Sequence, residues 1–197
     1  MTVLRTFIAC EIPVDLQEAI QAAIQPLRHA LGAGLVRWVP AHNVHLTLKF
    51  LGDVATPSLE LIQKTMTAEA SGFEAFDGSV EGFGAFPNLH RPSVLWIGFK
   101  APPTLAILQH ELDLATERLG YSGDERGFSP HLTIGRVRAA GSAVDMQKVR
   151  DELAQLQIDS LGSVHIDGVH LFKSDLQPGG AVYTRLYTAR FGEESRA

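Results

Sequence analysis

The sequence predicts an α+β fold in which most strands of the sheet are antiparallel. Strand-like and helix-like segments alternate along all 197 residues, several stretches are rich in strands, and no low-complexity linker divides the chain. The composition, 45% hydrophobic and 20% charged, is typical of a globular protein with its own core. We therefore expect residues 1–197 to form a single domain.

The N-terminal half alternates strand, helix, strand and helix. Residues 5–12 are rich in β-branched and aromatic side chains, and Pro13 ends this strand. Apolar residues at helical spacing then run from Leu16 to Leu31, and Pro26 is expected to kink that helix. A strand over about 44–51 and a helix from Thr56 to Ala70, with Pro57 at its first turn, complete this half.

The C-terminal half begins with two strands and continues with a helix that has leucines on one face and is ended by Gly120. A further strand, a helix and two final strands follow. The strands are expected at 73–83, 93–99, 131–138, 163–172 and 181–190, the helices at 105–119 and 144–156, and the loops at 84–92, 121–130 and 177–180.

An internal repeat indicates how the halves are related. The tetrapeptide His45-Leu46-Thr47-Leu48 recurs as His131-Leu132-Thr133-Ile134, each time at the start of a predicted strand that follows a helix. Self-similarity of this kind predicts two related halves that face each other.

Strand geometry places the polar residues of each tetrapeptide together. Residues two apart point the same way, so His45 and Thr47 share one face, as do His131 and Thr133. If the halves pack about a pseudo-twofold axis, two imidazoles and two hydroxyls converge. That set suits phosphodiester chemistry, since one imidazole can take a proton from water while the other gives one to the leaving oxygen. The threonine hydroxyls would donate hydrogen bonds to the non-bridging oxygens.

These tetrapeptides belong to a longer ordered series of motifs that runs nearly from end to end of the chain. The series resembles the two-histidine phosphoesterase superfamily, specifically its bacterial and archaeal RNA 2′,3′-cyclic phosphodiesterase branch, historically called 2′-5′ RNA ligase. The segments that carry the resemblance are Arg5-Thr6-Phe7-Ile8-Ala9, Arg37-Trp38-Val39-Pro40, Asn43 to Gly52, Phe86-Pro87-Asn88, Arg91 to Trp96, Phe128 to Arg136 and Leu171-Phe172-Lys173-Ser174.

The resemblance implies a bilobed α+β fold with two pseudo-symmetric lobes, helices outside and a central cleft. It implies hydrolysis of a terminal 2′,3′-cyclic phosphate to a 2′-phosphate, in which His45 protonates the leaving 3′ oxygen and His131 activates water. Weak reverse 2′-5′ joining of RNA ends, no cofactor and no metal are also implied. The expected partners are RNA ends or nucleotides that bear a 2′,3′-cyclic phosphate.

Three further residues are candidates for substrate binding. Arg136 stands where the family places a phosphate-binding arginine, although strict alternation from His131 would aim it at the opposite face unless a twist or bulge intervenes. Lys49 is expected on the same face as His45, where its ammonium either binds the substrate phosphate or is solvated, and the two alternatives are equally expected. Phe128 either stacks on a base or packs in the core. We expect structural roles for Trp38 and Trp96.

Composition narrows the remaining possibilities. The net charge of −5 argues against broad nonspecific binding of nucleic acid, so any RNA should be held locally. Cys10 is the only cysteine, which excludes an intramolecular disulfide, and His42, His165 and His170 lack nearby carboxylates at ligand spacing. We find no signal peptide or membrane span and expect a cytoplasmic monomer without an obligate protein partner.

Two alternatives remain open. A phosphodiesterase for small nucleotide or sugar cyclic phosphates would use the same catalytic residues and differ only in the walls of the site. A non-catalytic nucleotide- or RNA-binding module would keep the fold without turnover. Two complete His-x-Thr tetrapeptides argue against the second alternative.

Overall fold

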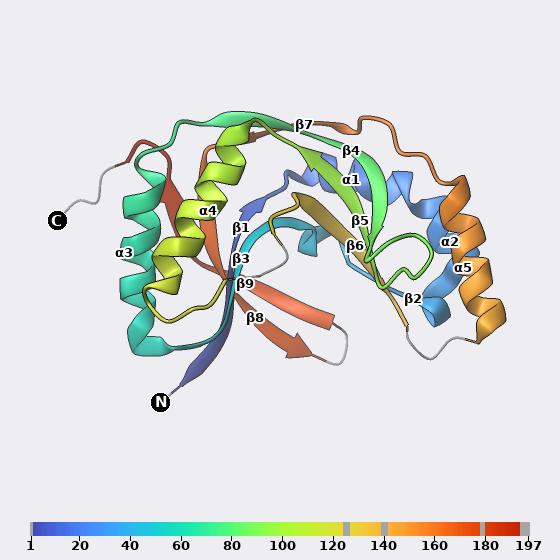
Figure 1. Ribbon diagram of the computed structural model, residues 1–197, viewed down its shortest axis with the longest axis horizontal. Coiled ribbons are helices and arrows are strands. Elements are labelled where there is room, and N and C mark those ends of the chain that lie inside the picture. The colour runs from blue at the N-terminus through green and yellow to red at the C-terminus, as the bar shows by residue number, and fades with distance from the viewer. Residues whose placement is uncertain (1, 124–126, 139–141, 178–179, 194–197) are drawn as a thin grey trace.

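The computed structural model of the chain describes residues 2–123, 127–138, 142–177 and 180–193, and within them nine strands form one sheet. The strand order is β7-β4-β5-β6-β3-β1-β8-β9, and β2 pairs with β6 beside this path. Every pairing is antiparallel. Figure 1 shows the curled sheet with α3 and α4 at one end and α1, α2 and α5 at the other. The expected α+β class with helices outside an antiparallel sheet is confirmed.

Most elements follow the expected order along the chain, but the short strand β2 was not predicted. The strands are β1 (Val3–Glu11), β2 (Val36–Trp38), β3 (His45–Ala55), β4 (Phe76–Phe86), β5 (Val94–Lys100), β6 (His131–Val137), β7 (Gly162–Ile166), β8 (Gly168–Gln177) and β9 (Gly180–Arg190). The helices are α1 (Val14–Ala23), α2 (Gln25–Leu35), α3 (Leu59–Ala70), α4 (Pro103–Glu117) and α5 (Ala143–Gln155), with short 3₁₀ turns at Ala41–Asn43 and Thr56–Ser58.

The first predicted helix is two helices. Pro26 does not kink one helix but lies in the first turn of α2, where its missing N–H costs nothing, and Ile24 joins α2 to α1. Buried Leu16 and Ile20 of α1 and Leu27 and Leu31 of α2 still continue one apolar face. The apolar periodicity therefore identifies the buried face correctly, and the break lies two residues before the proline.

The predicted strand 163–172 is wrong as a single element. The chain forms β7, turns at Asp167 and continues as β8. β7 pairs with β4 at one edge of the sheet, whereas β8 pairs with β1 and β9 near the other end. This short turn carries the chain from one end of the sheet to the other, which alternation of side chains does not reveal. Of the predicted turn 177–180, Pro178 and Gly179 lie outside the described residues.

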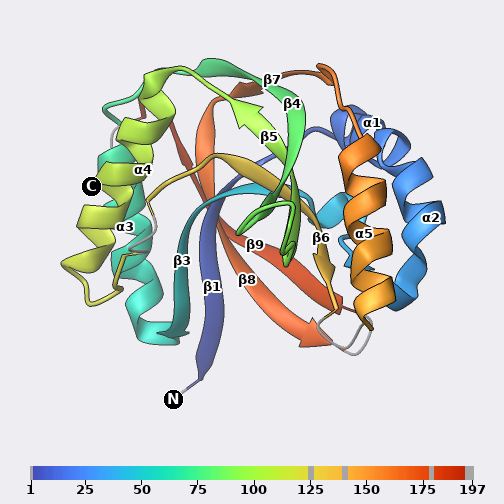
Figure 2. The same cartoon turned by 45° about the vertical axis from the view of Figure 1, so that its right-hand side comes forward.

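The main core lies between the sheet and the helices. Buried side chains of the central strands, including Ile8, Leu46 and Leu132, join those of the helices in one cluster. Figure 2 shows the same arrangement from another side, with the helices flanking the sheet. Cys10 is buried here as expected, and burial, aided by the charge of Asp167, raises the pKa of its thiol to about 12. No helix in the described part of the chain is long and apolar enough to cross a membrane.

Candidate active site

The two His-x-Thr tetrapeptides lie side by side at the centre of the sheet. β3 and β6 are antiparallel, and Leu46 is directly opposite Leu132. One residue further along each strand, this register places His45 opposite Thr133 and Thr47 opposite His131. Leu46 and Leu132 are fully buried in the main core, so the four polar side chains lie on the other face of the sheet, turned away from the helices. The repeated motif thus forms one site with approximate twofold symmetry about Leu46 and Leu132.

Each imidazole is held by the backbone two residues before it. Nδ1 of His45 lies 2.7 Å from the carbonyl oxygen of Asn43, and Nδ1 of His131 lies 2.7 Å from that of Ser129. A carbonyl only accepts, so each Nδ1 carries the proton and donates. In the neutral form, Nε2 of each ring is therefore the nitrogen that is free to take a proton.

The two histidines differ in their electrostatic surroundings. Burial lowers the pKa of His45 to about 4, the hydrogen bond to Asn43 opposes this, and the neighbouring charge of His131 adds to it. The pKa of His131 is also lowered, first by burial and then by the charge of Arg136, against its bond to Ser129. The charge of His131 acts on His45, and the charge of Arg136 acts on His131. The three groups therefore lie close together in one site.

Aromatic rings surround both imidazoles. Phe7 stacks on His45 with ring centroids 4.7 Å apart, and Tyr183 meets the same ring edge-on at 5.1 Å. On the other side, Phe86 meets His131 edge-on at 4.9 Å. Phe7 also joins Ala9 and Phe172 in a second, small buried cluster, separate from the main core. These rings exclude water from one side of the imidazoles and restrict their rotation.

A β-bulge follows the histidine in both tetrapeptides. Leu48 is the extra residue of β3, because Ala9 pairs with Thr47 and Ile8 with Lys49. Ile134 is the extra residue of β6, because Trp96 pairs with Thr133 and Leu95 with Gly135. Each bulge lies three residues after a histidine and reverses the alternation beyond it.

The bulge in β3 overturns the expectation for Lys49. Its side chain is buried on the face opposite the histidines, where its ammonium pairs with Asp113 of α4 and donates to the carbonyl of Ser122 at 2.8 Å. Lys49 is thus a structural residue that attaches α4 and the following loop to β3. Phe50, which strict alternation from Leu46 and Leu48 would place on the core face, is 62% exposed and lies 6.1 Å from Phe7, centroid to centroid.

The bulge in β6 resolves the question about Arg136. It turns Arg136 to the face that carries His131, and the side chain is exposed there. Arg136 occupies the place in its strand that Phe50 occupies in β3. Gly135, the counterpart of Lys49, is buried, and a Cβ there would lie 2.8 Å from Cγ1 of Val36, so glycine allows β2 to approach β6.

Phe128 does not lie among the rings around the histidines but packs against the main core, so its position gives no support to base stacking. The aromatic residues that do contact the imidazoles, Phe7, Tyr183 and Phe86, were missed as site residues. Phe7 appeared in the sequence only within the segment Arg5-Thr6-Phe7-Ile8-Ala9 that carries the family resemblance. Trp96, expected to be structural, lies over Gly84 and 6.4 Å from His131, centroid to centroid.

Asn43 is a second residue that sequence reasoning did not single out. It is buried, its side chain donates to the carbonyl of Ala181 in β9 at 2.7 Å, and its own carbonyl accepts from His45. It therefore connects the β8–β9 hairpin to the orientation of the imidazole. Ser129, which does the same for His131, is exposed, so the symmetry of the site is incomplete.

Two of the other histidines have polar partners of their own, and the ring of His170 also lies 6.1 Å from that of Phe172, centroid to centroid. Nδ1 of His165 is 2.8 Å from Asp77 on the surface, and that of His170 is 2.9 Å from the hydroxyl of Thr188. Among the described residues there is no group of three or more histidine, cysteine or acidic side chains placed to hold a metal ion.

Comparison with known proteins identifies the family. Residues 16–183 match the model of the 2′-5′ RNA ligase superfamily. The chain belongs to this superfamily. It is 34% identical to the RNA 2′,3′-cyclic phosphodiesterase of Methanothermobacter thermautotrophicus over 94% of this chain and 98% of that protein.

Solved structures of other proteins share the fold over nearly the whole chain. TT0787 of Thermus thermophilus superposes with a TM-score of 0.77 at 25% identity, over 98% of this chain and all of that one. LigT of E. coli complexed with 3′-AMP gives a TM-score of 0.73 at 25% identity, with the same coverage.

Proposed function

We propose that this protein hydrolyses the 2′,3′-cyclic phosphate at the end of an RNA to a 2′-phosphate, and that residues 1–197 act as one domain. The observation that carries the proposal is the pair of imidazoles on adjacent strands, each with Nδ1 held by a backbone carbonyl and a threonine directly opposite. The relative from M. thermautotrophicus, similar over nearly the whole chain, bears the name of this activity.

The proposed step displaces the 3′ oxygen from phosphorus. His131 takes a proton from water through Nε2 as the bond between the water oxygen and phosphorus forms. The bond from phosphorus to O3′ breaks on the opposite side, and O3′ takes a proton from His45. The 2′-phosphate remains, and both histidines return to their starting states by exchange of one proton each with solvent.

The protonation state of His45 in the free protein differs from the one that the proposed step needs. With a pKa of about 4, His45 is neutral at pH 7, whereas the proposed step needs it protonated. An anionic phosphate beside the imidazole raises its pKa, because opposite charges favour the protonated form. We therefore propose that His45 takes up a proton as the substrate binds.

The remaining polar groups stabilise charge on phosphorus. Thr47 and Thr133 lie across the strands from the histidines, where their hydroxyls can donate to the two non-bridging oxygens. Arg136 lies on the same face and supplies a positive charge beside His131. The same groups would catalyse the weak reverse reaction, in which a 5′-hydroxyl RNA end attacks the cyclic phosphate and forms a 2′-5′ bond.

The position of the product phosphate tests this proposal. Purified protein is incubated with a short RNA that ends in a 2′,3′-cyclic phosphate, and the terminal phosphate is assigned by phosphorus NMR. A 2′-phosphate is expected, because the proposed acid serves the 3′ oxygen. A 3′-phosphate would contradict the assigned geometry, and an unchanged substrate would contradict the function.

A further inference from the structure

The structure contains an arginine pair, Arg37 of β2 and Arg136 of β6, of which the proposed hydrolysis of one phosphate uses only Arg136. The two residues are directly opposite each other in the β2–β6 ladder, and both side chains are exposed. Like charges directly across a ladder destabilise a sheet. On its other side, Arg136 faces Val94 of β5, which cannot offset the charge.

Several other cations of this protein have carboxylate partners. On β9, Arg185 pairs with Glu11 and Arg190 pairs with Asp167. The remaining ion pairs found among the described residues belong to Lys49, Lys64, Lys100, Lys173, His165 and His170. Within that part of the chain the arginine pair takes part in none of them, although the protein carries a net charge of −5.

The arginine pair extends outward from the site. Arg136 is the nearer member, since its charge contributes to lowering the pKa of His131. Arg37 lies on the next strand and on the same face, because residues directly opposite in a ladder share a face. Tyr183, whose ring contacts His45, has a pKa raised by burial, and the charges of Arg136, Arg5 and Arg37 all oppose this rise. Arg5 differs from the pair in having an acidic residue, Asp53, as its cross-strand neighbour.

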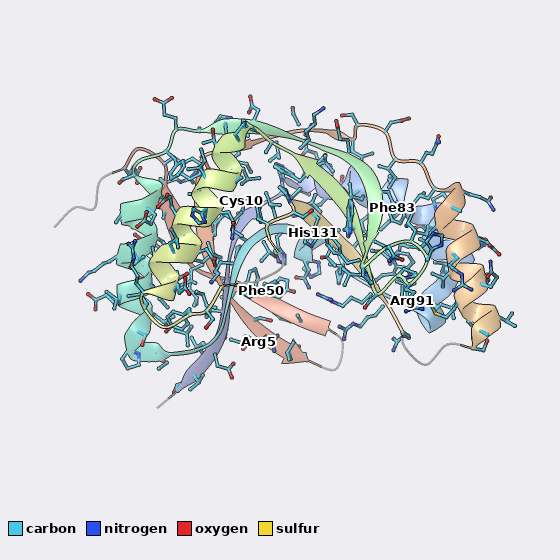
Figure 3. All side chains as sticks on the ribbon, in the orientation of Figure 1. Arg5, Cys10, Phe50, Phe83, Arg91 and His131 are labelled. Carbon is cyan, nitrogen blue, oxygen red and sulfur yellow. The ribbon has the colours of Figure 1, made fainter. Side chains whose placement is uncertain are left out.

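We propose that Arg37 binds the backbone phosphate next to the terminal cyclic phosphate, so that the site recognises an RNA strand rather than a mononucleotide. The inference rests on the proposed function and names the substrate class within it. A guanidinium presents several donors to a phosphate, and RNA carries one phosphate for each nucleotide, so neighbouring arginines match neighbouring phosphates. Figure 3 shows His131 near the middle of the molecule, with Phe50 and Arg5 toward the end of the sheet where β1 begins.

The test compares two substrates that share the same reacting group. One is a nucleoside 2′,3′-cyclic phosphate, and the other is a trinucleotide that ends in a 2′,3′-cyclic phosphate. In Arg37→Gln, the ratio of kcat/KM for the trinucleotide to that for the mononucleotide should fall about 5- to 10-fold through KM, as expected for a lost exposed contact with a charged group. The salt dependence of trinucleotide binding should weaken by a slope of about 0.7, the value for one phosphate contact on a single strand.

Two further variants give the controls. Arg150→Gln removes the same charge from α5, a helix that packs against α2 outside the sheet, and should leave the ratio at its wild-type value. Arg136→Gln should reduce kcat/KM for both substrates, because that residue serves the reacting phosphate. A ratio in Arg37→Gln equal to that of wild type would overturn the inference.

A binding measurement separates this inference from the proposed function. A fluorescent trinucleotide that ends in a 2′-phosphate is titrated with each protein, and binding is followed by anisotropy. Weaker binding to Arg37→Gln than to wild type and Arg150→Gln supports the inference even if wild type fails to hydrolyse either substrate. Equal binding by all three proteins overturns it, whatever the hydrolysis assay shows.

Discussion

The low pKa of His45 predicts a measurable loss of stability in acid. The histidine has a pKa of about 4 in the folded protein and an ordinary value of 6.5 when the chain is unfolded. As the pH falls below about 6.5, the unfolded chain takes up a proton that the folded protein refuses, so the free energy of unfolding decreases until the pH reaches about 4. The stability contributed by the neutral imidazole is therefore present above pH 6.5 and lost below it.

The magnitude follows from the two pKa values. They differ by about 2.5 pH units, from 6.5 to about 4, and each unit corresponds to about 1.4 kcal/mol. The full effect is about 3 to 4 kcal/mol, most of which is already lost at about pH 4.5. This is a large part of the stability of a typical domain.

Urea unfolding of wild type and His45→Gln at about pH 7.5 and about pH 4.5 measures the effect. Other groups titrate in both proteins, so the difference between the proteins isolates His45. Wild type should lose about 2–3 kcal/mol more than the variant between these pH values. His90→Gln, which changes an exposed histidine of the loop after β4, serves as the control and should behave as wild type. Equal acid sensitivity of wild type and His45→Gln would refute the buried, neutral imidazole.

Three other outcomes are expected. Asp113→Ala should destabilise the protein by about 2–4 kcal/mol in urea unfolding, because it leaves buried Lys49 without its charge partner. The kcat of the folded fraction should stay within about twofold of wild type. A large loss of kcat would instead indicate that Lys49 acts in catalysis. Asn43→Ala should lower kcat about 10-fold by freeing the carbonyl that orients His45, whereas an unchanged kcat would make the Ala181 contact purely structural. Hydrolysis should be insensitive to EDTA, and rescue of chelated protein by added metal would contradict the two-histidine mechanism.

Local pattern was enough to predict most elements and to predict that the two histidines lie close together. Apolar spacing indicated the helices, and the repeated tetrapeptide predicted which side chains share a face. The failures lie where the ladder departs from strict alternation. The bulges at Leu48 and Ile134 depend on pairing with β1 and β5, so no window of the sequence shows that Lys49 turns inward and Arg136 outward.

Long-range contacts limited the remaining predictions. Phe7 and Tyr183 contact His45 from β1 and β9, and Asn43 reaches Ala181, 138 residues away in the chain. One short turn at Asp167 joins β7 and β8, although these strands pair near opposite ends of the sheet. The continuous apolar run in the sequence conceals this turn. These features depend on the topology of the sheet, which only the family resemblance predicted from the sequence.

The central claim is that two histidines on β3 and β6 open a terminal cyclic phosphate. It is tested most directly by single-turnover hydrolysis of an RNA 2′,3′-cyclic phosphate in EDTA by wild type, His45→Ala and His131→Ala, with each variant shown to be folded. The account predicts conversion to the 2′-phosphate by wild type and a rate at least about 100-fold lower in each variant, the usual contribution of a general acid or base. Turnover by either variant at the wild-type rate would contradict it.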